Sequence, residues 1–315
     1  MATSGTVVYT VTESDIISDA LEDLGVYGAG ETVSASDTTK ARRKLNLILK
    51  QMSSASDYFS GEKFWLRKIG YLFLQKDQAV YNLGPSGDEC TGTYVRTTLS
   101  VSASGGAGTV TLTSVTGVAS TYRIGIELDS GSLQWTTVNG APSGSVVTLT
   151  ATLTGAASSG NTVFCYQTKA IRPLKLLTAV LRDINGNDVP VDISETIEGY
   201  EGIAYKANEG DPLSLYFTPT LTNSQVFIDV EPSDVTKVLR YTYRAPIEDM
   251  SAGTNNFDLP QEAFRYISAQ LAIDCAPSFN KEVGPTLKLI RDESLAILRN
   301  AQPQTTDLYF QPEME

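Results

Sequence analysis

The chain has 315 residues and a formal net charge of −12, from 24 basic and 36 acidic residues. This length allows one large domain or two to three smaller ones, and a hydrophobic fraction of 41% excludes disorder of the whole chain. The acidic balance argues against sequence-independent nucleic-acid binding, which needs a basic surface. Because the sequence has no histidine, it excludes Ser-His-Asp and Cys-His catalysis and every histidine-containing metal site.

Three scattered cysteines are too few for a zinc site or a secreted disulfide framework. We expect Cys90, Cys165 and Cys275 to be reduced and buried, and a bridge between Cys90 and Cys165 is the alternative. The first nine residues lack the basic run and apolar stretch of a signal peptide, and no segment reaches about 18 apolar residues. The sequence therefore predicts no standard export signal and no membrane span.

Helical periodicity dominates the first sixty residues. Thr12 is a candidate N-cap for a helix that ends at Gly25, and Ser36 or Asp37 is a candidate cap for a second helix. The second helix has an apolar face of Ala41, Leu45, Ile48, Leu49 and Met52.

The outer face of the second helix contains the densest basic cluster of the chain: Lys40, Arg42, Arg43 and Lys44. One interpretation is a solvated helix surface, and the other is contact with an acidic partner. Arg42 and Arg43 are the candidate partner-binding residues of this cluster.

Residues 69–83 alternate in polarity and predict a hairpin with its turn at residues 75–78. Residues 97–168 then contain only Arg123, Glu127 and Asp129 as charged residues, together with short β-type runs and glycine-rich turns. These features predict a small all-β sandwich or barrel, in which Gly125 and Gly131 form a tight corner and Trp135 is a core aromatic.

Strand patterns resume after Lys169. We expect a strand at residues 173–181, a turn at Asn185 and Gly186, and its partner at residues 189–193. A meander of strands at residues 213–217, 226–230 and 235–243 follows, and then helices from about Pro260 and at residues 285–300. The tail at residues 302–315 has no periodicity, and its apolar cluster of Leu308, Tyr309 and Phe310 is predicted to dock on a partner.

The similar style of the flanking segments predicts that the β module is inserted at a hairpin tip. The expected domains are an adaptor core of residues 1–85 and 170–300, an inserted all-β domain of residues 86–169, and an extended tail of residues 301–315. The expected fold class is α+β, with a mainly helical core, antiparallel β-hairpins and the inserted sandwich or barrel. Helices from both ends of the sequence should pack together.

The sequence offers few candidates for chemistry. Glu195 with Glu198 and Glu201, or Glu248 with Asp249, are possible carboxylate pairs, although solvated surface acids explain them equally well. The acidic and amide side chains of residues 183–188 resemble the start of a calcium loop, but a glycine at the fourth position favours a plain hairpin. No phosphate-binding or dinucleotide-binding glycine motif is present. We therefore predict no catalytic residue, cofactor or metal ligand.

Several segments resemble the tail accessory factors of tailed bacteriophages, which are head-to-tail adaptors that bind below the portal. At the N-terminus these are residues 12–25 (TESDIISDALEDLG), 40–52 (KARRKLNLILKQM) and an aromatic stretch ending at Leu66. In the C-terminal half they are residues 241–249 (YTYRAPIED), 257–260 (FDLP) and 272–277 (AIDCAP), where Ala245 replaces a usual arginine or polar residue. Residues 124–140 (IGIELDSGSLQWTTVNG) are similar to a β module of phage structural proteins.

This resemblance implies a virion component in the neck or tail that is assembled in the host cytoplasm. It would form a ring, commonly of twelve subunits, between the portal protein and the tail nozzle or another tail protein. Its C-terminal extension would climb along the portal, and DNA would pass through an acidic lumen without specific binding. The alternatives are a baseplate or tail adhesin with Trp135 or a tyrosine as a glycan-stacking platform and, third, a peptidoglycan hydrolase.

Overall fold

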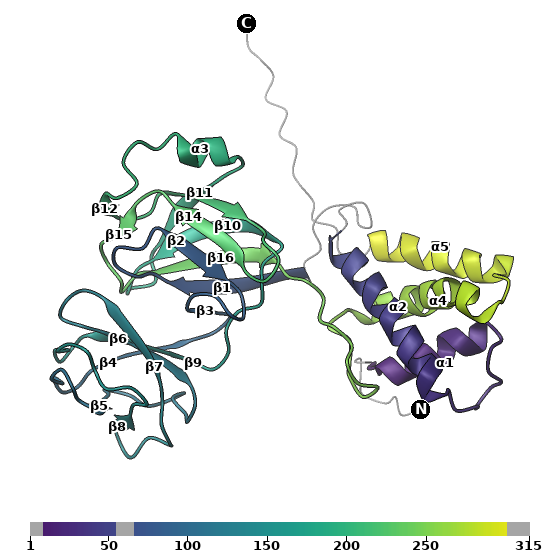
Figure 1. Cartoon of the computed structure of the whole chain (residues 1–315), viewed down its shortest axis with the longest axis horizontal. Coiled ribbons are helices and arrows are strands. Elements are labelled where there is room, and N and C mark those ends of the chain that lie inside the picture. Colours follow the sequence, from purple (N-terminus) through teal and green to yellow (C-terminus); the bar gives the residue numbers. More distant parts are fainter. Residues whose placement is uncertain (1–8, 55–65, 301–315) are drawn as a thin grey trace, which may run out of the picture. The chain divides into compact units, whose positions relative to one another are not determined.

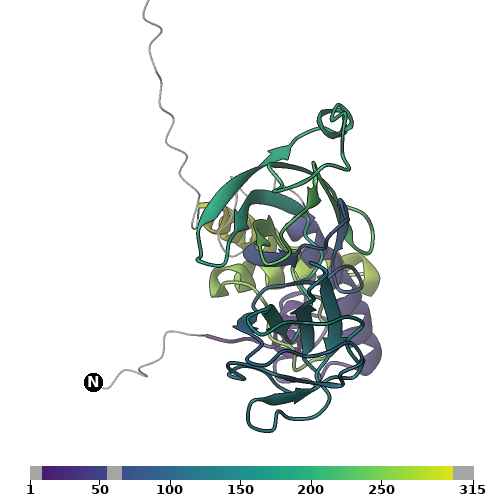
Figure 2. The ribbon, with the colours of Figure 1, turned by 90° about the vertical axis from the view of Figure 1, so that its left-hand side faces the viewer.

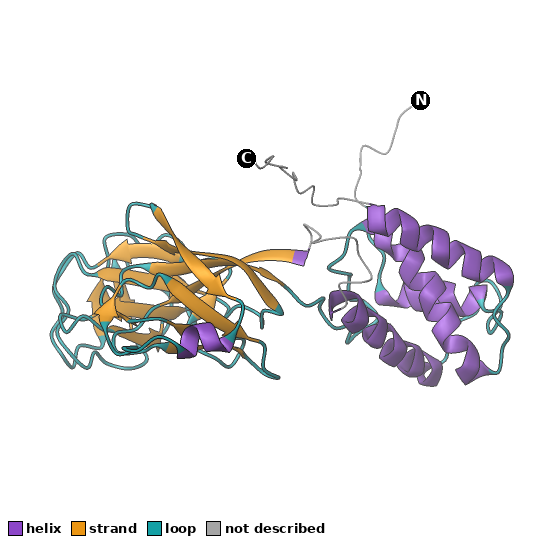
Figure 3. Ribbon diagram, turned by 90° about the horizontal axis from the view of Figure 1, so that it is seen from above, coloured by secondary structure: helices purple, strands orange, loops and turns teal. Residues whose placement is uncertain are grey.

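The computed structural model describes residues 9–54 and 66–300, which form two compact units (Figure 1). One unit combines the two ends of the chain, up to Arg67 and from Pro246 onward, and the other comprises Lys68–Ala245. The four long helices belong to the first unit, and strands dominate the second (Figure 3).

The expectation of an α+β fold with a mainly helical core is wrong. Most regular elements are strands, and they include an eight-stranded sheet that closes almost into a barrel. The physical reason is that each class of element buries its own apolar surface. The helices cover one another and the curved sheet encloses its own core, so neither requires the other for burial.

The helical unit is built from α1 (Glu13–Asp23), α2 (Ala35–Ser54), α4 (Phe264–Cys275) and α5 (Pro285–Asn300), with short 3₁₀ turns at η3 (Gln261–Ala263) and η4 (Ala276–Phe279). The predicted packing of helices from both chain ends is confirmed, because α1 and α2 share one core with α4 and α5. The predicted apolar face of α2, including Leu45 and Leu49, is buried in this core.

The start and end of α1 agree with the sequence prediction. The Thr12 side chain accepts a hydrogen bond from the Asp15 backbone, and the Asp15 carboxylate accepts one from the Thr12 backbone, which completes a capping box. Gly25 follows the helix at φ +71°, a conformation that glycine adopts without a steric penalty.

The eight-stranded sheet contains strands from distant parts of the chain. Its members, in spatial order, are β2 (Val80–Leu83), β14 (Ser224–Ile228), β13 (Ser214–Thr218), β11 (Asp188–Ser194), β10 (Lys175–Arg182), β16 (Val238–Arg244), β1 (Arg67–Phe73) and β3 (Cys90–Thr91). The strands β2 and β3 are opposite edges, yet only six residues separate them along the chain. Because six residues span at most about 20 Å, the sheet must curl until its edges approach.

The predicted hairpin at residues 69–83 is wrong in its pairing. Strands form on both sides of the expected turn, but β1 pairs with β16 and β3, while β2 pairs with β14. The Tyr81 hydroxyl accepts a hydrogen bond from the Gln75 N–H and donates one to the Gln75 carbonyl, so a side chain of β2 stabilises the segment between β1 and β2. The connection therefore joins distant strands of the barrel instead of closing a hairpin.

The strands after Lys169 follow the prediction in part. Antiparallel β10 and β11 form the expected hairpin, with Gly186 at φ +87°. The Asp183 carboxylate accepts hydrogen bonds from the backbone of Asn185 and Asn187, which supports the turn instead of a calcium loop. The later strands do not form a continuous meander, because β13 pairs in parallel with β11 and β16 pairs with β10. The short parallel pair β12 (Glu209–Gly210) and β15 (Glu231–Pro232) and the five-residue α3 (Ile197–Glu201) lie in the connections.

The predicted β module has its own core. A four-stranded sheet in the order β4 (Val95–Thr98), β9 (Thr162–Tyr166), β6 (Arg123–Glu127), β7 (Leu133–Thr137) is accompanied by the ribbon of β5 (Thr109–Thr111) and β8 (Val146–Thr148). Every position of β9 is buried, because Val163 and Cys165 face the module core whereas Phe164 and Tyr166 belong to a second cluster with Phe73 of β1. The module is therefore docked on the eight-stranded sheet (Figure 2).

The entry and exit of the module lie side by side. The Thr91 hydroxyl donates to the Thr168 carbonyl at 2.8 Å, and the Ala170 N–H donates to the Cys90 carbonyl at 2.8 Å. The division into core, insert and tail at residues 85, 170 and 300 stays a prediction. The three cysteines are free and buried, as predicted, without a bridge between Cys90 and Cys165.

Candidate interaction site on the helical unit

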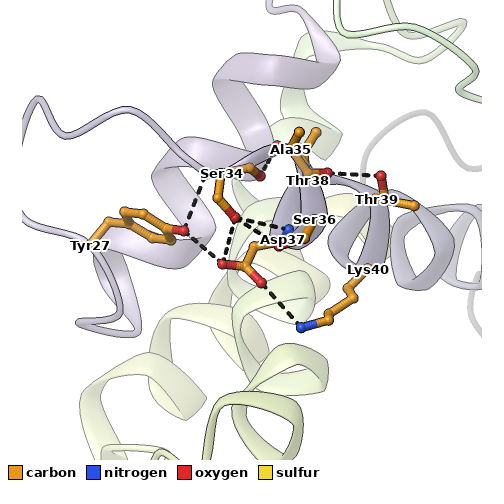
Figure 4. Close-up of polar contacts among 8 residues, drawn as sticks. All are labelled: Tyr27, Ser34, Ala35, Ser36, Asp37, Thr38, Thr39 and Lys40. Atoms are coloured by element: carbon orange, nitrogen blue, oxygen red, sulfur yellow. Dashed lines mark hydrogen bonds and ion pairs between the residues drawn. The ribbon is translucent and has the colours of Figure 1, made fainter.

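The start of α2 is fixed by hydrogen bonds that differ from those predicted (Figure 4). Ser34, not Ser36 or Asp37, caps the helix: its hydroxyl accepts from the Asp37 N–H at 3.2 Å and donates to the Asp37 carboxylate at 2.9 Å. The Tyr27 hydroxyl also donates to that carboxylate at 2.7 Å. These bonds from Tyr27 and Ser34 lower the pKa of Asp37 and anchor the first turn of the basic helix.

The predicted basic cluster is divided between internal bonds and the surface. Arg42 pairs with the fully buried Glu13 of α1, with 2.5 Å between its Nε and the Glu13 Oε1. The Lys44 ammonium donates to the Asp274 carbonyl at the end of α4. Lys40 pairs with Asp37 at 3.2 Å and remains exposed, as does Arg43. Of the two candidate residues, Arg42 pairs with a buried carboxylate inside the unit, and Arg43 is exposed to solvent.

An exposed row on α2 extends beyond the predicted cluster. Lys40, Arg43, Leu47 and Lys50 recur every three or four residues on the side opposite the buried face, and we call them the α2 row. Leu47 is 66% exposed in the middle of this row. Lys50 contacts Asp249 at 2.6 Å, in a pair whose side chains are both largely exposed. The sequence analysis missed Leu47, although its helical position opposite Leu45 and Leu49 was a usable signal.

The outward face of α1 has the opposite charge. Asp15, Asp19, Glu22 and Asp23 occupy it, and α1 contains no basic residue. Partial burial and the neighbouring carboxylates of Asp23, Asp15 and Glu22 raise the pKa of Asp19. Hydrogen bonds from Thr12 lower the pKa of Asp15 instead.

A groove runs beside this acidic face, between α1 and α4. Its volume is about 370 Å³, and its apolar lining comes from Tyr9, Val11, Ile16 and Phe264. Asp19, Glu22 and Asp23 line it on the α1 side, and Arg265 and Ser268 line it on the α4 side. We call this feature the α1–α4 groove. Sequence reasoning did not find it, because its walls come from segments about 240 residues apart.

The second predicted binding element lies outside the described residues. The described part of the chain ends at Asn300, so the structure does not place Leu308, Tyr309 or Phe310. Docking of the tail on a partner stays a prediction.

Trp135 is placed where it joins two parts of the strand unit. It is half-buried, and its ring centroid lies 4.9 Å from that of Phe73 on β1 and 5.7 Å from that of Tyr166. The prediction that Trp135 lies in the module core is wrong. It belongs to the contact between the module and the eight-stranded sheet. With its ring packed against these neighbours and over Gly125, it is poorly suited as a free stacking platform for a sugar.

Polar bonds reinforce the same contact. The Gln75 side-chain amide exchanges two hydrogen bonds with the Leu133 backbone, at 3.1 and 3.2 Å. The Glu89 carboxylate accepts hydrogen bonds from Arg123 and Tyr166, and burial together with the Glu89 bond raises the pKa of Tyr166. The hollow beside Trp135, about 450 Å³, is therefore walled by groups that already bind one another.

The predicted carboxylate pairs do not form an enclosed site. Glu198 and Glu201 are exposed on the short helix α3, and Glu195 is exposed just before it. Glu248 is exposed, and Asp249 pairs with Lys50. Among residues 9–54 and 66–300, no group of three acidic or cysteine side chains is arranged to hold a metal ion.

No known family model matches the chain, and a comparison with curated proteins finds no relative. Within the described residues, no helix is both long and apolar enough to span a membrane.

Proposed function

We propose that this chain is a structural virion protein, a phage head-to-tail adaptor that assembles as a ring beneath the portal and links it to the tail. The observation that carries the proposal is the composition of the helical core. Segments that resemble the adaptors are dispersed over the sequence, yet Leu21, Leu45, Leu66, Ile247 and Ala272 from five of them share one hydrophobic cluster. A shared core is expected if these segments are parts of one assembly domain.

The charged surfaces of the helical unit also support an assembly role. The α2 row and the acidic α1–α4 groove are surfaces suited to protein partners of opposite charge. In the proposed assembly the partners are the portal protein, the tail nozzle or another tail protein, and further copies of this chain in a twelvefold ring. The DNA would pass through the ring without specific contacts, consistent with the net charge of −12.

The adhesin alternative receives less support. A glycan-binding module needs an accessible aromatic face, whereas Trp135 packs against Phe73 and Tyr166 and its neighbours are bound to one another. The surroundings of Trp135 therefore favour the adaptor over the adhesin.

Co-sedimentation with the portal ring encoded by the same genome tests the proposal. We expect the full chain to join the portal, and a version that ends at Asn300 to lose most of this binding because it lacks Leu308, Tyr309 and Phe310. Failure of both versions to bind would refute the adaptor function. Equal binding by both would retain the adaptor and refute the docking tail.

A further inference from the structure

The first two helices of the chain carry opposite charges. The helix α1 contains five acidic residues and no basic one, whereas α2 contains five basic residues and one acidic residue. One pair, Arg42 and Glu13, neutralises itself inside the unit, and Asp37 is bound in the cap of α2. Lys44 is bonded to the Asp274 carbonyl. The exposed charges that remain are Lys40, Arg43 and Lys50 on α2 and Asp15, Asp19 and Asp23 on α1.

The two charged rows have similar lengths. At 1.5 Å per residue, Lys40 and Lys50 are separated by about 15 Å along α2, and Asp15 and Asp23 by about 12 Å along α1. Burial and, after it, the neighbouring carboxylates raise the pKa of Asp19, and a cationic partner surface would favour its charged form.

An apolar feature accompanies the charges on each side. Leu47 projects from the α2 row at 66% exposure, between Arg43 and Lys50. The α1–α4 groove offers an apolar floor that includes Ile16 and Phe264 beside its acidic rim. A leucine flanked by cations is therefore complementary in polarity and charge to the α1 side of the groove, where Asp19, Glu22 and Asp23 lie beside an apolar lining. Arg265 lines the opposite, α4 side.

The matching surfaces do not meet within one chain. The groove is lined by Tyr9, Val11 and residues of α1 and α4, and the α2 row faces away from the core that joins these helices. Two different surfaces that complement each other produce a head-to-tail contact between copies, and repetition of such a contact forms a ring where the rotation between copies closes, and a filament where it does not.

We propose that copies of this chain associate head to tail, with the α2 row of one copy seated on the α1–α4 groove of the next. Leu47 enters the groove, and Arg43, Lys40 and Lys50 face Asp19, Glu22 and Asp23 of the neighbour. This inference rests on the proposed ring-forming function and names its subunit contact. Because exposed ion pairs are individually weak, the association requires the row and Leu47 together and weakens as salt rises.

Charge reversal with the full chain tests the contact. Sedimentation velocity at low salt, over rising protein concentration, should show self-association of the wild type. Arg43→Glu and Asp19→Lys should each weaken it by at least about tenfold. An equimolar mixture of the two variants should associate again. The reversed row of Arg43→Glu meets the reversed groove of Asp19→Lys, and the unaltered row of Asp19→Lys meets the unaltered groove of Arg43→Glu.

Controls separate the contact from folding and from general charge effects. Lys288→Glu changes another exposed cation, on α5, and should leave association unchanged. Leu47→Asn removes the apolar contact while it preserves the row's charge, and should also weaken association. Unaltered circular dichroism and melting temperature would show that each variant is folded.

Three results would overturn the inference: a wild type that stays monomeric at its highest soluble concentration, reversals that have no effect, or a mixture that fails to recover. The adaptor function is tested separately, by co-sedimentation of the same variants with the portal ring. If Arg43→Glu loads the portal as a complete ring, the contact is refuted and the adaptor stands. If no variant binds the portal but the reversal pattern appears, the contact stands and the adaptor is refuted.

Discussion

At the scale of single residues, Arg42 and Arg43 are adjacent in sequence but lie in different environments. Arg42 neutralises Glu13, which is completely buried, while Arg43 extends into solvent. A carboxylate buried without its cation is strongly unfavourable, whereas an exposed cation contributes little to stability. Arg42 therefore has a structural role, whereas its neighbour Arg43 is a surface residue.

We predict that Arg42→Ala lowers the free energy of unfolding of the helical unit by about 2 kcal/mol or more, while Arg43→Ala changes it by less than about 0.5 kcal/mol. The estimate for Arg42 is below that for a fully buried pair, since its side chain is 28% exposed. Urea denaturation of both variants measures the difference. Glu13→Gln in the Arg42→Ala background should recover part of the loss, and an equal effect of the two single variants would contradict the assignment.

Asp15 and Asp19 should respond to pH in opposite directions. The pKa of Asp15 is lowered in the folded state by bonds from Thr12, so its contribution is present above the unfolded pKa and is lost as pH falls through the folded pKa. The pKa of Asp19 is raised by burial and neighbouring carboxylates, so its penalty is present near neutrality and disappears as pH falls through the folded pKa.

Asp15→Asn should therefore destabilise the protein at pH 7, and Asp19→Asn should stabilise it. Each difference from the wild type should vanish below the lower of the two pKa values of the group, which is the folded pKa for Asp15 and the unfolded pKa for Asp19. Chemical denaturation at a series of pH values, at a concentration where the chain is monomeric, measures these differences. The same sign for both variants would contradict the interpretation.

At the scale of elements, the contact between β6 and β7 determines why Gly125 must be glycine. The two strands pair Gly125 with Trp135, and a Cβ at residue 125 would lie 2.7 Å from the indole ring. Trp135 cannot move freely, because it packs against Phe73 and Tyr166. The glycine thus permits the close approach that docks the module on the sheet.

We predict that Gly125→Ala destabilises the strand unit by about 1–3 kcal/mol, through the displacement of Trp135. Gly108→Ala is a matched control in the same module, since its added Cβ would meet only Thr152 at 3.8 Å. Thermal unfolding followed by tryptophan fluorescence should report a lower midpoint and altered emission for Gly125→Ala alone. Identical behaviour of the two variants would refute the packing argument.

At the scale of the whole molecule, the two ends of the module segment are bonded side by side, so we predict that removal of the module leaves the rest of the fold intact. Thr91 and Thr168 are bonded directly, and a short turn can replace the chain between them. The loss includes the aromatic packing around Phe73, whose ring lies 4.8 Å from that of Phe164 and 4.9 Å from that of Trp135, and the bonds of Gln75 and Glu89 to the module.

A variant with residues 93–166 replaced by a short glycine-containing turn should retain its β-type circular dichroism and unfold cooperatively. It should lose about 1–3 kcal/mol, because each aromatic pair contributes about 0.5–1.5 kcal/mol. Phe73→Ser in this variant should improve its solubility by removing the uncovered ring. Loss of all cooperative unfolding would show that the eight-stranded sheet depends on the module.

Local sequence signals succeeded where neighbouring residues decide the structure. The N-cap Thr12 and the helical run to Gly25 correctly predicted α1, and the turn at Asn185 and Gly186 correctly predicted a hairpin. The low-charge segment correctly predicted a β module with its own core. These features depend on capping bonds, backbone conformation and hydrophobic periodicity, which act over a few residues. The adaptor function, the tail contact and the ring stay proposals.

Only the tertiary structure decided which distant elements meet. The strands on either side of residues 75–78 carried correct β patterns, but the curl of the sheet gave each a partner about 150 residues away or more, which overturned both the hairpin and the mainly helical core. The same holds for the site, because the pairing of Arg42 with Glu13 and the groove between α1 and α4 depend on packing that no local pattern encodes. Periodicity identifies the face that an element buries, whereas closure of the sheet and helix packing select its partner.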